Sequence, residues 1–191
     1  MEFLENKTNS DVILKILVIG EIKTGKSLFI QRLTNLDDYE FKRSTKSYNE
    51  TIGLEFNIKY INFNNTIFKL QFWDTSGQER FNTILRTFFE HANVILIFFD
   101  AEDRNSFERA KNIYKEKCKE IKNATIILIR SKYGNSKKEF INCISDEEAL
   151  EFVDRNKISF AHICCFEKYE TGIKELITLI LTQYLRKNKL Q

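Results

Sequence analysis

The sequence predicts an α/β fold, with a mainly parallel sheet covered by helices on both faces. Two observations predict it: short apolar runs alternate with amphipathic stretches along the whole chain, and most runs are continuously apolar, as buried parallel strands are. The 191 residues suit one compact domain, since 42% are hydrophobic and 30% are charged. A net charge of only +3 does not indicate a nucleic-acid-binding protein, which carries a clustered basic face.

Strands and helices are expected to follow one another in order. Apolar runs predict strands at residues 12–19, 54–63, 67–73, 94–99, 124–129 and 158–165. Helices are expected at residues 26–35 and 103–119, after Ser145, and from Ile173 to Leu185.

Local signals mark where several of these elements begin and end. Gly20 closes the first strand, and Asn64-Asn65 is a hairpin turn signal between the second and third. Ser145 precedes three acidic residues, a pattern typical of a helix cap and first turn. Residues 37–50 and 132–138 are expected to be loops.

The ends of the chain and its cysteines bear on location. Residues 1–11 are polar, with no features of a signal peptide, and we expect a short tail there, a main domain over residues 12–186 and the start of a second tail at 187–191. No apolar run reaches the ~20 residues of a membrane span. The cysteines form no CxxC pair, which argues against zinc and favours reduced thiols in the cytoplasm; they are Cys118, Cys143, Cys164 and Cys165.

The strongest motif is a phosphate-binding loop over residues 20–27, GEIKTGKS, which fits G-x-x-x-x-G-K-[ST] without a gap. It lies between an expected buried strand and an expected helix, so its backbone amides and the helix N-terminus would attract phosphate groups. Lys26 is expected to reach the β- and γ-phosphates, and Ser27 to bind Mg²⁺. The alternative is a glycine turn that matches by chance.

Three residues further along are suited to a nucleoside triphosphate. Asp74 ends the third strand, where a carboxylate can hold Mg²⁺. Gly77 offers an amide to a γ-phosphate, and Gln78 is suited to holding a water for in-line attack. Upstream, Thr51 can complete the Mg²⁺ shell while the γ-phosphate is present, which is how such loops become ordered.

These motifs together resemble the Ras superfamily of small GTPases, and specifically the Rab family. Residues 51–56 (TIGLEF) resemble the stretch after the first switch, and residues 69–81 (KLQFWDTSGQERF) resemble the second-switch signature. Residues 88–92 (FFEHA) and 100–107 (DAEDRNSF) match two further landmarks. The resemblance runs from about residue 12 to residue 185.

The resemblance implies a P-loop NTPase small G-protein fold, with a six-stranded sheet and five helices, and a GTP/GDP- and Mg²⁺-dependent switch in vesicle traffic. It implies catalytic roles for Gln78 and Lys26, and Mg²⁺ ligands at Ser27, Thr51 and Asp74. The nucleotide-binding set that it implies is Gly20, Glu21, Ile22, Lys23, Thr24, Gly25, Lys26, Ser27, Leu28, Thr51, Gly77, Ser131, Lys132, Glu167 and Lys168.

The implied partners are effectors, exchange factors and GTPase-activating proteins that bind the switch regions. Phe56, Trp73 and Phe88 fall where Rab proteins keep an aromatic cluster that shapes this surface, although each is equally compatible with core packing. Rab proteins also end in prenylated cysteines, whereas residues 186–191 hold none. We therefore expect peripheral attachment to endomembranes only through a prenylated end that this sequence lacks.

The phosphate loop departs from the family pattern at Ile22 and Lys23, where small residues are usual and the second is generally glycine. Ile22 would crowd Gln78 and a partner's arginine finger, which contributes roughly 10³–10⁵-fold in rate. This predicts slow hydrolysis and a weak response to activating proteins, although Gln78 itself is retained.

The guanine-reading motifs depart further. Residues 131–134 (SKYG) stand where the family has Asn-Lys-x-Asp, so Gly134 cannot accept the two guanine N–H groups. Residues 166–168 (FEK) stand where the family has Ser-Ala-Lys, and the backbone amide of Glu167 is expected to face the base. Either nucleotide binding is weaker and less specific, or the loop repacks and guanine binding survives. The charged residues 37–46 lengthen the first switch, as a solvated loop or as a partner contact.

Two rival functions remain at this point. A non-hydrolysing interaction module is favoured by Ile22, Lys23 and Gly134, and opposed by the intact Lys26, Ser27, Thr51, Asp74 and Gln78. A P-loop kinase for nucleotides or metabolites would need an acceptor pocket, and the stretch DTSGQ at residues 74–78 is not expected of one.

Overall fold

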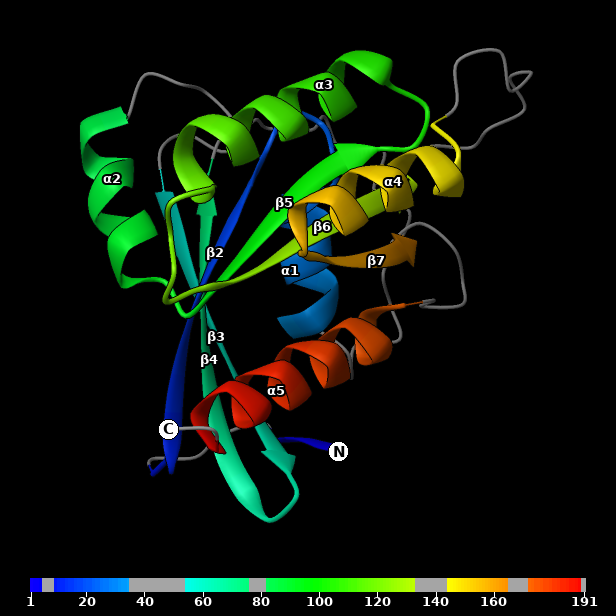
Figure 1. The fold of residues 1–191 in the computed structure, drawn as a ribbon. Coiled ribbons are helices and arrows are strands. Elements are labelled where there is room, and N and C mark those ends of the chain that lie inside the picture. Colours follow the sequence, from blue (N-terminus) through cyan, green and yellow to red (C-terminus); the bar gives the residue numbers. More distant parts are fainter. Residues whose placement is uncertain (5–8, 35–53, 76–81, 133–143, 165–171, 190–191) are drawn as a thin grey trace.

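The computed structural model describes residues 1–4, 9–34, 54–75, 82–132, 144–164 and 172–189, and Figure 1 shows their arrangement. The strands are β1 (Glu2–Leu4), β2 (Val12–Gly20), β3 (Leu54–Phe63), β4 (Thr66–Thr75), β5 (Val94–Asp100), β6 (Thr125–Lys132) and β7 (Ser159–Cys164). The helices are α1 (Lys26–Thr34), α2 (Asn82–His91), α3 (Arg104–Ile113), the π-helical turn η2 (Tyr114–Cys118), α4 (Asp146–Asn156) and α5 (Ile173–Lys189).

The strands form one sheet in the order β1-β3-β4-β2-β5-β6-β7. From β4 to β7 all neighbours are parallel, whereas β3 pairs antiparallel with both β4 and β1. The predicted mainly parallel α/β fold is therefore confirmed. The sheet has a seventh strand beyond the six that the family resemblance implies, because β1 forms from residues expected to be a tail.

Helices cover both faces of the sheet, and each face has its own hydrophobic core (Figure 1). On one face, α1 and α5 pack on the strands through residues such as Phe29, Leu33 and Ile177. On the other face, α2, α3 and α4 pack through residues such as Phe89 and Phe107. In the described part of the chain, no helix is long and apolar enough to cross a membrane.

Several expected local signals are confirmed. Asn64 and Asn65 both have left-handed backbones, with φ of 52° and 61°, as the tight turns of hairpins require. The Ser145 side chain accepts a hydrogen bond from Glu148 N and caps α4. The helix expected at 103–119 is divided: Asp103 caps α3, and η2 takes over at Tyr114.

Candidate functional site

The phosphate loop follows β2, the strand at which the sheet's chain order reverses. β2 lies between β4 and β5 in the sheet, so later strands lie on both sides of it. The chain leaves the carboxyl end of β2 toward α1. Crevices at such a reversal are where α/β sheets bind ligands. The structure thus places Gly20–Ser27 at the end of the sheet where the sequence predicts a nucleotide.

Gly20 begins the loop in a conformation that only glycine accommodates. Its φ is +144°, and a Cβ on this residue would lie 2.3 Å from the backbone oxygen of Phe98 on β5. The absence of a side chain therefore lets β2 and β5 approach closely and turn the chain into the loop.

Hydrogen bonds within the loop fix its curvature. The Thr24 hydroxyl donates to the carbonyl oxygen of Glu21 at 2.9 Å, and the Ile22 amide donates to the Glu21 carboxylate at 3.0 Å. A carboxylate oxygen thus already binds one amide of the predicted anion cradle. This contact is not predictable from the sequence, because any residue in the variable part of the motif satisfies the pattern.

Lys26 lies inside the loop, as the motif requires. Its Nζ donates to the carbonyl oxygens of Gly20 at 3.0 Å and Glu21 at 2.8 Å, and the residue is only 5% exposed. Burial lowers the pKa of Lys26 to about 8, an effect that the nearby carboxylates of Asp74 and Glu21 partly oppose. An ammonium this poorly hydrated gains much from a phosphate group brought beside it.

Asp74 is the complementary buried charge. It is 1% exposed near the end of β4, where burial raises the pKa of its carboxyl to about 6. A hydrogen bond from Ser27 and the positive charge of Lys26 lower the pKa and limit this rise, whereas Glu55 adds to it. The register pairs Asp74 with Val18 of β2, so the carboxylate belongs to the strand beside the loop.

The donor set fits Mg²⁺. Among the described residues, Asp74 Oδ1 is buried without a hydrogen-bond partner, which is costly for a carboxylate oxygen. A hard cation that takes oxygen ligands would satisfy it, and the hydroxyl of Ser27 contacts the same carboxylate. Thr51, the third predicted ligand, lies outside the described residues.

Ser131 connects the end of β6, where the sequence predicts contacts with the base, to the phosphate loop. Its hydroxyl lies 2.6 Å from the carbonyl oxygen of Thr24 and 3.0 Å from that of Phe99, and the residue is 3% exposed. Lys132 ends β6 directly beside it. Ser131 therefore supports the loop through its side chain, a role that the sequence reasoning did not assign to it.

Thr75 is a second support that the sequence reasoning missed. It ends β4 after Asp74, and its buried hydroxyl donates to Val18 O at 3.0 Å. This bond holds the end of β4 against β2, beside the predicted Mg²⁺ ligand. A threonine next to a predicted metal-binding aspartate carries no distinctive signal in a single sequence.

The three predicted aromatic residues lie together. Phe56 on β3 pairs with Trp73 on β4, so their side chains share one face of the sheet. The rings of Trp73 and Phe88 pack edge to face, with 4.6 Å between their centres. Trp73 is buried in the core beneath α2, whereas Phe56 is 52% exposed. Core packing thus accounts for Trp73 and not for Phe56.

The described residues bring together only part of the predicted site. Leu28 is buried in the core at the start of α1, so its side chain faces away from a ligand. Other predicted residues lie outside the described part of the chain; they are Thr51, Gly77, Gln78, Gly134, Glu167 and Lys168.

Comparison with known proteins agrees with this geometry. A profile of the Ras family matches residues 15–186. Ras-related protein Rab-1 of Theileria parva is 30% identical over 181 residues, covering 91% of this chain and 78% of the relative. Ras-related protein Rab-1 of Theileria annulata is 31% identical over 181 residues, again covering 91% of this chain and 78% of the relative. Ras-related protein RabC of Dictyostelium discoideum is 30% identical over 175 residues, covering 90% of this chain and 83% of the relative.

Proposed function

We propose that this chain, which belongs to the Ras family and is of the Rab type, is a Mg²⁺-dependent guanine-nucleotide switch with slow GTP hydrolysis. One observation supports the proposal above all: a buried carboxylate with an orphaned oxygen, Asp74, lies beside the buried ammonium of Lys26 and the hydroxyl of Ser27. Two buried charges and a hydroxyl at the end of a phosphate loop suit a metal–phosphate ligand.

The chain's own residues divide the work of binding and hydrolysis. The loop amides and the α1 N-terminus hold the phosphates, and Lys26 stabilises the charge that develops on them. Ser27, Asp74 and Thr51 would hold Mg²⁺, which neutralises charge on the β- and γ-phosphates when bound. Gln78 orients the attacking water, and Thr51 and Gly77 respond to the presence of the γ-phosphate.

Ile22 is the reason to propose slow hydrolysis. It is only partly buried and stands within the loop. Its branched side chain would reduce the space available to Gln78 and to an arginine finger. Because the phosphate-binding residues are intact, we propose that binding persists while turnover is slow. We further propose that Phe56, Trp73 and Phe88 contribute to effector binding in vesicle traffic.

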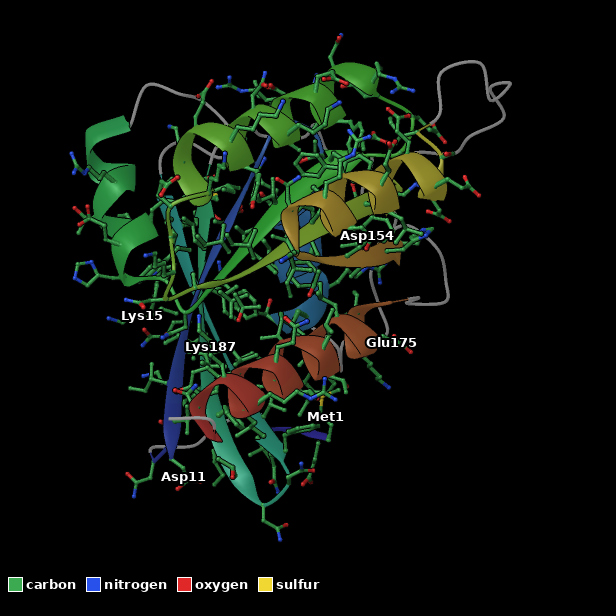
Figure 2. All side chains as sticks on the ribbon, in the orientation of Figure 1. Met1, Asp11, Lys15, Asp154, Glu175 and Lys187 are labelled. Carbon is green, nitrogen blue, oxygen red and sulfur yellow. The ribbon has the colours of Figure 1, made fainter. Side chains whose placement is uncertain are left out.

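The test is to extract nucleotide from the purified protein, identify its base, and titrate fluorescent GTP, GDP and ATP analogues with and without Mg²⁺. The expected result is guanine-nucleotide binding that weakens on Mg²⁺ chelation and in Asp74→Asn, with a γ-phosphate release rate below that of an ordinary Rab. The matched control is Asp154→Asn, because Asp154 is exposed on α4, away from the loop (Figure 2).

Two outcomes would contradict the proposal in different ways. Binding with no release of γ-phosphate over many hours would favour a non-hydrolysing interaction module. Failure to bind any nucleoside triphosphate or diphosphate would overturn the switch altogether.

A further inference from the structure

Lys23 has a backbone conformation that its side chain disfavours. Its φ is 64°, in the left-handed region that costs free energy for residues other than glycine. The other described non-glycine residues with positive φ are Asn64 and Asn65 in the hairpin turn and Lys157 at the end of α4, which are common places for it. Lys23 stands in the middle of the phosphate loop, so its strain is located at the candidate site.

The loop is held firmly on both sides of Lys23. Before it, the Ile22 amide is bound by the Glu21 carboxylate, and after it, the Thr24 carbonyl accepts a hydrogen bond from Ser131. Lys23 itself is exposed, and its ammonium has no hydrogen-bond or ion-pair partner among the described residues. A charged side chain is therefore projected from a fixed, strained position with nothing in the described structure to pair with.

The charges of the loop explain what this ammonium adds. Lys26 and Glu21 carry opposite charges, and the Glu21 carboxylate accepts a hydrogen bond from the Ile22 amide of the same loop. Without Lys23, the positive charge of Lys26 would be matched within the loop itself. With Lys23, residues 20–27 carry a net positive charge, which favours a multiply charged phosphate chain.

We propose that Lys23 is a second phosphate-binding ammonium of the loop, which slows the release of nucleoside di- and triphosphates. This inference rests on the proposed function. A contact to phosphate is indifferent to the base, so Lys23 contributes affinity that does not depend on the altered guanine-reading motifs of this chain. Its contribution also depends on the number of phosphates and falls as salt increases.

The experiment measures the dissociation of fluorescent GDP from wild-type protein, Lys23→Gln and Lys23→Arg at low and high salt. Lys23→Gln keeps a side chain on the strained backbone and removes the charge, and Lys23→Arg keeps the charge. The matched control is Lys15→Gln, because Lys15 lies on the half of β2 remote from the loop (Figure 2).

We expect Lys23→Gln to release GDP roughly fivefold faster at low salt, the upper end of what one exposed charged contact contributes. Lys23→Arg and Lys15→Gln should stay within about twofold of wild type, the difference should shrink at high salt, and the same ratio should hold for a fluorescent ADP. Equal release from Lys23→Gln and wild type would overturn the inference and leave the proposed function intact. A wild-type protein that binds no nucleotide would overturn both.

Discussion

The hydroxyl of Ser131 lies 2.6 Å from the carbonyl oxygen of Thr24, although 107 residues separate the two in the chain. Thr24 belongs to the phosphate loop and Ser131 to the end of β6, where the family reads the base. One buried contact therefore couples the two halves of the candidate nucleotide site.

Ser131→Ala should destabilise the protein by about 1–3 kcal/mol, because it leaves the buried Thr24 carbonyl without its donor. Urea denaturation followed by circular dichroism measures the change. Thr178→Ala is the matched control, since that hydroxyl is exposed and, within the described residues, bonds to Lys174 of α5 and to Met1. It should cost less than about 0.5 kcal/mol. A Ser131→Ala protein as stable as the control would show that the contact does not hold the loop.

Metal-free and nucleotide-free protein should lose stability as the pH rises from about 4 to about 6. Burial raises the pKa of Asp74 from 3.8 to about 6, so the folded state binds more protons than the unfolded state in this window. Lys26 stays protonated throughout, because its lowered pKa is about 8. Above pH 6 the loss in the free energy of unfolding is complete and amounts to about 3 kcal/mol.

Asp74→Asn should remove most of that pH dependence and raise the stability of the empty protein near pH 7. Denaturation in a chelator across pH 4–7.5 measures both effects, with Asp154→Asn retaining the wild-type slope. The same substitution should lower nucleotide affinity, so a gain in stability and a loss of binding are expected together. Identical slopes in Asp74→Asn and wild type would refute the assignment of the titration to Asp74.

Gly20→Ala should destabilise the protein by about 3 kcal/mol or more. The added Cβ would lie 2.3 Å from the Phe98 carbonyl oxygen, and the φ of +144° is unfavourable for alanine as well. Thermal unfolding measures the loss, with Lys15→Ala on the same strand as a control. A small change would mean that β5 can move away from β2 at little cost.

Lys59 and Phe3 should be energetically coupled. The Lys59 ammonium lies 5.7 Å from the centre of the Phe3 ring and 3.4 Å from the carbonyl oxygen of Thr34, the last residue of α1, although Lys59 is only 6% exposed. A double-mutant cycle with Lys59→Met and Phe3→Leu should give a coupling of about 0.5–1 kcal/mol. Additive effects would indicate that the Lys59 ammonium and the Phe3 ring do not stabilise one another.

Much of the fold is predictable from the sequence because its signals are local. Continuous apolar runs give the central strands, and the bounds of β3 are predicted to the residue. Asn64-Asn65 and Ser145 act through their own backbone and side-chain chemistry, so no distant partner is needed to interpret them. The phosphate loop is predictable for the same reason, since strand, loop and helix adjoin in the chain.

The features that escape prediction depend on distant contacts. β1 has three residues, and only its pairing with residues 60–62 makes it a strand. α2 matches no element that the hydrophobic pattern predicts, and η2 continues α3 without a change in periodicity that the sequence reveals. The burial of Asp74 and Lys26, and the support that Ser131 gives to the loop, arise only once the strands assemble. The roles of Thr51, Gly77, Gln78, Glu167 and Lys168 stay predictions.

The pairing of β1 with β3 also decides where the polypeptide starts in space. Met1 Sδ lies 3.8 Å from the Thr178 hydroxyl on α5, at the end of the molecule remote from the phosphate loop (Figure 1). A fluorophore or affinity tag joined at the amino terminus would be tethered at the end of the molecule away from the phosphate loop, so it would leave that loop unobstructed. Such a label is also a direct reporter of the seventh strand, because fraying of β1 would release it from the sheet edge.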